Sequence, residues 1–205
     1  VFKDIKEVLP GHYLTVTTDY HHNVKVKDLD NNSDLTQIQE EMYHVTTGCY
    51  YGLEVNPSTF EIAWGTGMEN KSGNKRYQIS YTVKDVVTDY NDCQEIYWQF
   101  LEQGRNTIPA QKVTGTVTLP EMVDNLDDLK VWGHGQLNGI IEKTSAQKVR
   151  FELENLNVGK RLEIRIITSE KMFNSNVNKV RGYNYLEDAL KEEEKWANEA
   201  NKPQN

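Results

Sequence analysis

Strict alternation of apolar and polar side chains is the feature that most constrains how this chain can fold. Residues 77–83 place Tyr77, Ile79, Tyr81 and Val83 on one face, as a half-buried β-strand requires. The same alternation recurs in segments 13–17, 24–27, 59–64, 113–119, 149–154 and 161–167. Many short strands separated by turn signals predict a mainly β fold, an antiparallel β-sandwich that is immunoglobulin-like in general architecture.

Turn residues indicate how some of these strands connect. Segments 149–154 and 161–167 flank a turn signal at residues 157–159, so we expect them to form a hairpin or to be neighbours in one antiparallel sheet. Segments 66–76 and 104–107 carry Gly, Asn and Ser and are predicted to be loops.

Two helices are expected beside the strands. Residues 89–101 carry apolar side chains at helical spacing, which predicts a short inserted helix. A second helix is predicted near the C-terminus, where Asn184 can act as the N-cap with Glu187 three residues later. We therefore expect a β-sandwich domain over residues 1–183, and a C-terminal helix and linker over residues 184–205.

The charge balance limits the classes of partner. The 205 residues carry 23 Lys and Arg against 31 Asp and Glu, a net charge of −8. Nucleic acids and anionic lipids require a clustered basic surface, so neither is expected as the main partner. No stretch approaches 18 consecutive apolar residues, so we expect this chain to contain neither a membrane span nor a signal peptide.

The cysteines and the acidic segment at residues 28–34 give little sign of a metal. Cys49 and Cys93 stand 44 residues apart without a Cys/His cluster, so we expect no zinc site; a disulfide remains an alternative to buried thiols. Residues 28–34 resemble a calcium loop, but Ser33 and Gln39 stand where that loop needs Gly and Glu. A polar turn between strands is favoured there, and no metal or other cofactor is expected.

Four acidic residues offer a possible catalytic pair. Asp85, Asp89, Asp92 and Glu95 could supply the two carboxylates of a glycosidase, since Asp92 and Glu95 would share one face of the predicted helix. Carboxylates in the first turn of a helix also satisfy its free N–H groups, and we favour this capping role.

The segment 131–139 is the most unusual stretch of the chain. Its glycines surround Trp132 and His134 and predict a tight loop that presents an aromatic surface. A sugar-binding platform would use Trp132 for stacking, with His134 and Asn138 as hydrogen-bonding groups. The alternative, which we favour, is a buried tryptophan whose neighbouring glycines allow a sharp bend.

Several segments together resemble one protein family. They are Tyr77-Gln-Ile-Ser-Tyr-Thr-Val-Lys-Asp-Val-Val, Tyr90-Asn-Asp-Cys-Gln-Glu-Ile-Tyr-Trp98, Val117-Thr-Leu-Pro120 and Val131-Trp-Gly-His-Gly-Gln-Leu-Asn-Gly139. They are similar to the N-terminal domain of the predicted bacterial membrane proteins of domain-of-unknown-function family 2207. The resemblance covers roughly residues 60–173, and residues 1–59 match poorly.

This resemblance implies a location but no chemistry. It implies a signal peptide removed upstream, an extracytoplasmic β-rich domain and transmembrane segments beyond residue 205. This chain would then lack an N-terminal strand or two of that domain, or begin inside it. The domain would then touch a membrane only through segments outside this chain. Cys93 stands where the family has small apolar residues, which favours a buried thiol at that position.

We therefore expect a non-catalytic outer domain of an anchored envelope protein, and hold three hypotheses for its role. The first is a protein-interaction or sensory module, which predicts an exposed apolar patch or an unpaired sheet edge. The second is a module that binds cell-wall carbohydrate, with Trp132 or Trp98 exposed beside polar groups. The third is a wall hydrolase, with two carboxylates about 5–9 Å apart in a cleft and one raised pKa.

Overall fold

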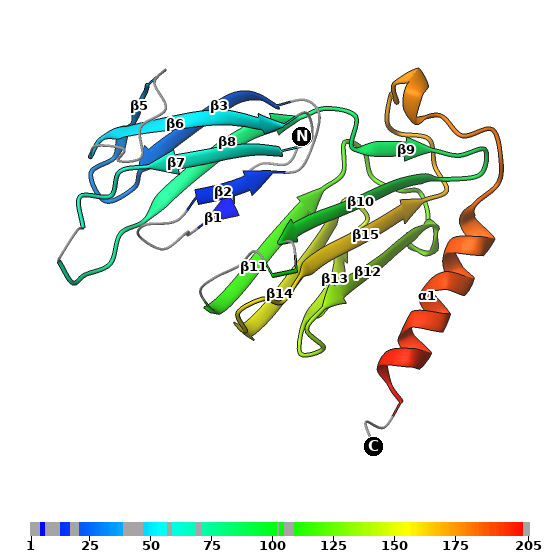
Figure 1. Cartoon of the computed structure of the whole chain (residues 1–205). Helices are drawn as coiled ribbons and strands as arrows, with labels where there is room; N and C mark the ends of the chain where they lie inside the picture. The colour runs from blue at the N-terminus through cyan, green and yellow to red at the C-terminus, as the bar shows by residue number, and fades with distance from the viewer. Residues whose placement is uncertain are drawn as a thin grey trace. The chain divides into compact units, whose positions relative to one another are not determined.

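The computed structural model describes residues 5–6, 13–16, 21–38, 47–56, 59–68, 71–101, 103–104 and 109–202. The chain divides into two compact units, residues 1–84 and 85–205 (Figure 1). Both units are built mainly from antiparallel strands, which confirms the prediction of a mainly β fold.

The first unit contains strands from two sheets whose side chains meet in one core. One sheet has the strand order β1 (Ile5–Lys6), β8 (Tyr77–Val83), β3 (His21–Asp28), β4 (Ser33–Asp34), and the other β2 (Tyr13–Val16), β7 (Thr59–Trp64), β6 (Cys49–Asn56), β5 (Thr36–Gln37). Tyr77, Ile79 and Tyr81 are buried, as the alternation along β8 predicts. The rings of Trp64 and Tyr77 pack edge to face with centroids 5.8 Å apart, which joins β7 to β8.

The second unit also contains two sheets. They have the strand orders β12 (Leu129–Gly135), β15 (Leu162–Thr168), β10 (Gln94–Leu101), β9 (Val87–Asp89), and β11 (Ala110–Thr118), β14 (Lys148–Leu156), β13 (Ile140–Ser145). The 3₁₀ turns η1 (Leu126–Asp128) and η2 (Val177–Lys179) lie in connections, and the helix α1 spans Leu186–Ala200. Phe100 on β10 contacts Phe151 on β14, with ring centroids 5.1 Å apart, and so links the two sheets.

The pairing predicted for segments 149–154 and 161–167 is wrong. Both segments are strands, β14 and β15, but they are central strands of different sheets. The chain crosses between sheets at the turn around residues 157–159, where the sequence alone shows only a turn. All residues of β15 are buried, whereas β14 alternates between buried and exposed positions, because α1 covers the face of β15 that points away from the core.

The helix predicted over residues 89–101 is also wrong, because this segment contains the last residue of β9, a turn and strand β10. Strand β10 carries large side chains on both faces. Ile96 and Trp98 enter the core between the sheets, while Glu95 and Tyr97 face α1. A strand that is covered on both faces does not show the alternation of apolar and polar residues that identifies a half-buried strand. In this segment the apolar residues happen to follow the spacing of a helix.

The C-terminal helix is confirmed, but its predicted cap is not. Helix α1 begins at Leu186 with Tyr185 at the N-cap position and no side-chain cap of its own. Instead, the Asp92 carboxylate accepts the N–H groups of Tyr185 (2.8 Å) and Leu186 (3.2 Å). The favoured capping role of Asp92 is therefore correct in kind, although the helix that it caps is α1.

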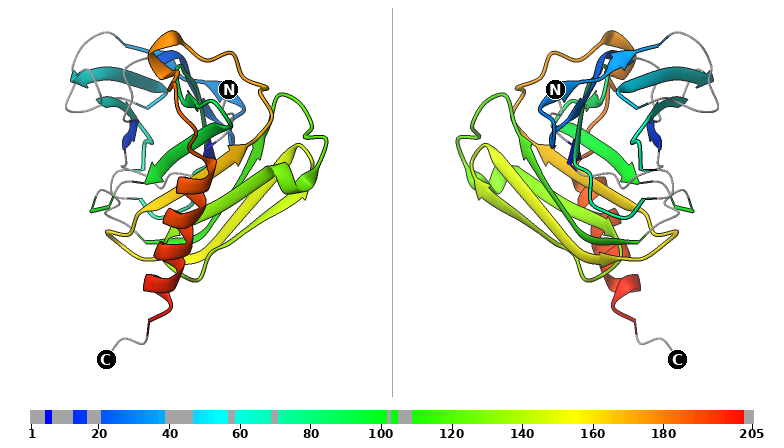
Figure 2. Two further views of the ribbon diagram at one scale, coloured as in Figure 1. Left: turned by 90° about the vertical axis from the view of Figure 1, so that its right-hand side faces the viewer. Right: turned by 90° about the vertical axis from the view of Figure 1, so that its left-hand side faces the viewer.

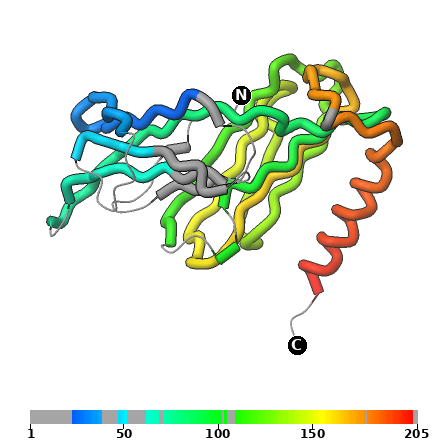
Figure 3. Tube along the Cα trace, turned by 45° about the horizontal axis from the view of Figure 1, so that its top comes forward, coloured from blue at the N-terminus to red at the C-terminus, as the bar shows by residue number. Residues whose placement is uncertain are grey.

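Helix α1 lies in the second compact unit, residues 85–205. Both views in Figure 2 show α1 running beside the sheet that contains β15. The Cα trace in Figure 3 shows the segment after β15 looping round before it enters α1, and this segment makes a backbone bridge from Val180 to Asp89 of β9. Among the described residues, no helix has the length and apolar character that crossing a membrane requires.

Candidate functional site

The contact between α1 and its sheet holds a dense group of charged and aromatic side chains. Part of this contact is apolar, with a cluster of four buried residues and three half-buried ones against it. The buried ones are Tyr90, Cys93, Ile167 and Ala189, and the half-buried ones are Trp132, Tyr185 and Leu186. The rest of the contact is polar and centres on Arg165.

Arg165 lies in the middle of β15, and its side chain is 2% exposed. Its Nε donates to Glu95 Oε1 (2.7 Å), and its Nη1 donates to Glu192 Oε2 and Glu193 Oε1 (both 2.8 Å). Its Nη2 donates to the hydroxyl of Tyr185 (2.8 Å). One guanidinium thus connects β10 to α1, and it offsets the cost of burying its carboxylate partners.

The strand register explains why aromatic rings surround this guanidinium. Arg165 stands directly opposite Tyr97 on β10 and Trp132 on β12. Its Cζ lies 5.7 Å from the ring centroid of Tyr97 and 6.0 Å from that of Trp196 on α1. Aromatic faces at this distance attract a cation and exclude water from it.

A second polar group adjoins the first through Glu193. His134 Nε2 lies 2.9 Å from Glu193 Oε2, and the hydroxyl of Tyr97 lies 3.3 Å from His134 Nδ1. The same hydroxyl donates to Glu163 Oε2 (3.0 Å), whose other oxygen accepts from Gln99 Nε2 (2.8 Å). We call these residues, together with Arg165 and its partners, the Arg165 network.

The charges of this network follow from their neighbours. Burial alone would raise the pKa of Glu193, but hydrogen bonds from His134 and Arg165 outweigh burial and lower it. Burial would lower the pKa of Arg165, but its carboxylate partners raise it. Burial, followed by the charge of Glu163, raises the pKa of Tyr97. Glu193 and Arg165 are therefore ionised at neutral pH, and Tyr97 is neutral.

The acidic residues proposed as a catalytic pair are engaged elsewhere. Asp89 pairs with Lys171, and Asp85 lies 3.5 Å from the side chain of Asn176. Asp92 caps α1 and Glu95 binds Arg165. The predicted shared helical face does not exist, because Glu95 lies in a strand and Asp92 in the turn before it.

The predicted loop at 131–139 is instead the end of β12 followed by a turn. Trp132 and His134 lie two residues apart on the face of β12 that α1 covers, and Trp132 is half-buried. Gly135 has φ +141°, and a side chain there would meet the carbonyl oxygen of Arg161. The glycine therefore lets two backbones approach at the strand end.

Asn138 lies away from Trp132 and His134, in the turn between β12 and β13. Its side chain donates to the carbonyl of Glu154 (2.5 Å) and accepts from Gln136 Nε2 (2.7 Å). The Gln136 Oε1 accepts the backbone N–H of Asn157 (3.1 Å). These amides fasten the β12–β13 turn to the β14–β15 turn.

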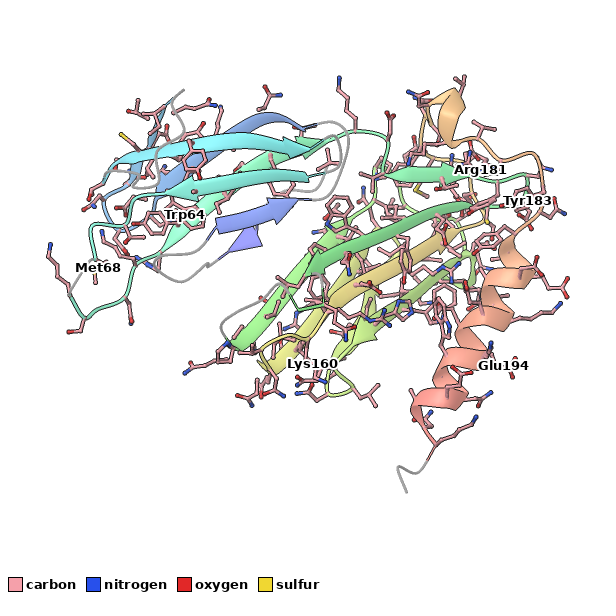
Figure 4. The ribbon with its side chains drawn as sticks, viewed as in Figure 1. Trp64, Met68, Lys160, Arg181, Tyr183 and Glu194 are labelled. Atoms are coloured by element: carbon pink, nitrogen blue, oxygen red, sulfur yellow. The ribbon has the colours of Figure 1, made fainter. Side chains whose placement is uncertain are left out.

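The two fastened turns expose aliphatic side chains. Leu137 is 76% exposed, Val158 is 54% exposed, and Ile140 at the start of β13 is 64% exposed. We call these three residues the apolar tip. Figure 4 labels Lys160, in the β14–β15 turn at this end of the unit, and Tyr183 at the opposite end. The tip therefore presents apolar surface from a rigid, hydrogen-bonded support.

Arg165 and the apolar tip were not among the residues predicted from the sequence. Arg165 stands between Ile164 and Ile166, and this alternation predicts an ordinary exposed position of a half-buried strand. One sequence feature could have indicated its role: the predicted C-terminal helix has few apolar residues but carries Glu192 and Glu193, whose charge is opposite to that of Arg165. Such a helix needs polar contacts to dock.

The remaining predictions concern residues outside this region. The polar turn at residues 28–34 is confirmed, since Asp28 Oδ1 accepts the N–H groups of Asp30 (2.9 Å) and Asn31 (3.1 Å). Both cysteines are free; Cys93 is fully buried, as favoured, and Cys49 is half-buried. Within the described ranges, no group of His, Cys, Asp and Glu side chains is arranged to hold a metal ion.

Comparison with known proteins identifies the family. The model of the family described as "predicted membrane protein (DUF2207) N-terminal domain" matches residues 5–168. The chain belongs to this family, which confirms the resemblance and extends it towards the N-terminus. Helix α1 lies beyond the matched residues. No curated protein and no solved structure matched the chain.

Proposed function

We propose that this chain is a non-catalytic domain on the extracytoplasmic side of a membrane, where it binds another envelope protein through the apolar tip. Membership in a family of predicted membrane proteins supports a place at a membrane. The outer side, the protein partner and the absence of catalysis are the parts that we propose.

The state of the acidic residues supports a non-catalytic role. A glycosidase needs a carboxyl group with a raised pKa as its general acid. The pKa values of Asp92 and Glu193 are lowered instead, in each case because hydrogen bonds outweigh burial. Both carboxylates make hydrogen bonds that hold α1 in place, so their role is structural.

The apolar tip is the observation that carries the proposal. Exposed aliphatic side chains grouped on adjacent turns are typical of interaction surfaces, whereas single exposed ones are ordinary. The side-chain amides of Gln136 and Asn138 already fix these turns. Binding a partner would therefore cost little conformational entropy for ordering the turns. A protein partner fits better than a polysaccharide, because the tip offers aliphatic groups without an aromatic stacking face.

Photo-crosslinking in living cells tests the partner. A photoreactive amino acid replaces Leu137 in the membrane-borne protein, and a matched variant carries it at Met122. Met122 is 69% exposed, but it lies near Ala146 and the start of β14, at the end of that strand away from the tip. We expect a discrete protein adduct from position 137 that position 122 does not give.

The other outcomes count against the proposal. Equal adducts from both positions, or adducts with lipid alone, would contradict a protein partner at the tip. Saturable co-sedimentation with purified cell-wall polymer, lost in Trp132→Ala, would favour the carbohydrate hypothesis. The side of the membrane is tested in a Leu137→Cys variant, which an impermeant maleimide should label in intact cells; labelling only after lysis would contradict it.

A further inference from the structure

The two edges of the β11–β14–β13 sheet differ in how they are protected. An edge strand exposes unpaired N–H and C=O groups, and proteins usually block such edges with charges, bulges or short strands. Strand β13 has all three features: it is six residues long, carries Glu142 and Lys143, and has a register shift between Lys143 and Ser145. Lys143 also donates to the carbonyls of Leu126 (2.9 Å) and Leu129 (3.1 Å).

Strand β11 at the other edge has less of this protection within the described part of the chain. It spans Ala110–Thr118 and pairs with β14 without a register shift. The β-branched residues Val113, Thr114 and Thr116 favour pairing. Lys112 is its charged residue, and Lys112 already contacts Glu152 of β14 (2.6 Å). Among the described residues, β14 supplies the backbone partners of β11.

We propose that β11 pairs antiparallel with β11 of a second copy of this chain, about a two-fold axis at Thr114. Rotation about that axis places Lys112 of one copy opposite Thr116 of the other. No two like charges then stand opposite each other, and two threonines meet on the axis, a favourable cross-strand pair. The two three-stranded sheets would join into one continuous sheet.

In this register, the inner face of β11 in one copy is also complementary to the inner face of β11 in the other copy. Val113 of one copy would stand opposite Gly115 of the other. The ring of Phe151 lies where a side chain on Gly115 would be, so the half-buried Val113 would gain an apolar neighbour across the junction. A charged peptide strand would find no free opposite charge on β11, because Lys112 already pairs with Glu152. This surface is separate from the apolar tip, and the proposal stands whether or not the tip binds a partner.

Cysteine crosslinking tests the two-fold axis directly. Thr114→Cys and Thr118→Cys are compared in a Cys49→Ser background, where the remaining Cys93 is buried. Both threonines are exposed on the same face of β11. In the proposed dimer the two copies of position 114 are within disulfide range, whereas the two copies of position 118 are about 27 Å apart along the strands.

We expect disulfide-linked dimers from Thr114→Cys to form at least about ten-fold faster than from Thr118→Cys, under mild oxidation and physiological salt. Equal rates would overturn the proposal. So would the absence of dimers from Thr114→Cys while its thiol still reacts with a maleimide, because the site would then be accessible but unpaired.

Charge substitution at the axis provides a second, reversible test. Thr114→Lys and Thr114→Glu each place like charges opposite one another and should weaken self-association about five-fold or more in sedimentation experiments. An equimolar mixture of the two variants should restore it, because Lys then faces Glu. Unchanged self-association in the single variants, or no restoration in the mixture, would contradict pairing about Thr114.

Discussion

Replacing Arg165 by methionine removes the cation that joins β10 and β15 to α1, while it keeps a long side chain at that position. Glu95 and Glu193, which are both buried, lose their positive partner at 2.7 and 2.8 Å. Glu192 also loses a contact, but its side chain is 39% exposed, so water can solvate it.

The expected cost follows from the buried partners. Removing one member of a buried ion pair destabilises a protein by about 3–5 kcal/mol, because it leaves an uncompensated charge. The exposed Glu192 adds at most about 1 kcal/mol. We therefore expect Arg165→Met to lower the free energy of unfolding of the second unit by about 3–5 kcal/mol, a large fraction of the stability of an ordinary domain.

Urea unfolding followed by tryptophan fluorescence measures this loss, because Trp132 and Trp196 both lie at the α1 contact. Lys191→Met is the matched control, since Lys191 on α1 pairs with Glu187 in solvent, and it should leave stability unchanged. Adding Glu193→Gln to Arg165→Met should recover part of the loss by removing a buried charge. A cost below about 1 kcal/mol for Arg165→Met, without any recovery, would refute the reasoning.

The remaining predictions concern pH, capping, backbone strain and thiol reactivity. The pKa of Glu193 is lowered in the folded chain, so its contribution is complete above its ordinary value of 4.5 and is lost as pH falls below it; urea titrations at several pH values should show this loss, and Glu193→Gln should reduce it. Asp92→Ala should cost about 1 kcal/mol by the same assay, because it uncaps α1. Gly135→Ala should lower the melting temperature, since φ is +141° there and the Arg161 carbonyl blocks a side chain. Burial, followed by the charge of Asp92, raises the pKa of Cys93 to about 12, so mass spectrometry should find it alkylated by iodoacetamide only after urea is added.

The strands with one buried face were the predictable part of this fold. The alternation at residues 77–83 and 149–154 corresponds directly to β8 and β14, because each has one face in a core and one towards solvent. Strand β10 escaped prediction because α1 covers its second face. Its apolar pattern depends on a helix that lies about 90 residues later in the chain.

The candidate residues could be found individually, but their arrangement could not. Trp132, His134 and Asn138 are close in sequence, yet a strand end separates them: the first two face α1, and Asn138 fastens a turn. Their use as a ligand site stays a prediction. The burial and the partners of Arg165 depend on the cross-strand register and on the docking of α1, and no local sequence pattern predicts either of these. Asp92 does cap a helix, but the helix expected around it does not exist, and no local pattern shows that it caps α1 instead.

Hydrogen exchange of α1 tests most directly the central claim that the Arg165 network holds this helix against the sheet. In the wild type, we expect the amides of residues 189–200 to exchange slowly, in step with the neighbouring strands. In Arg165→Met they should exchange about a hundred-fold faster or more, while the amides of β8 in the first unit change little. Fast exchange of α1 in the wild type, or the same slow exchange in both proteins, would contradict the claim.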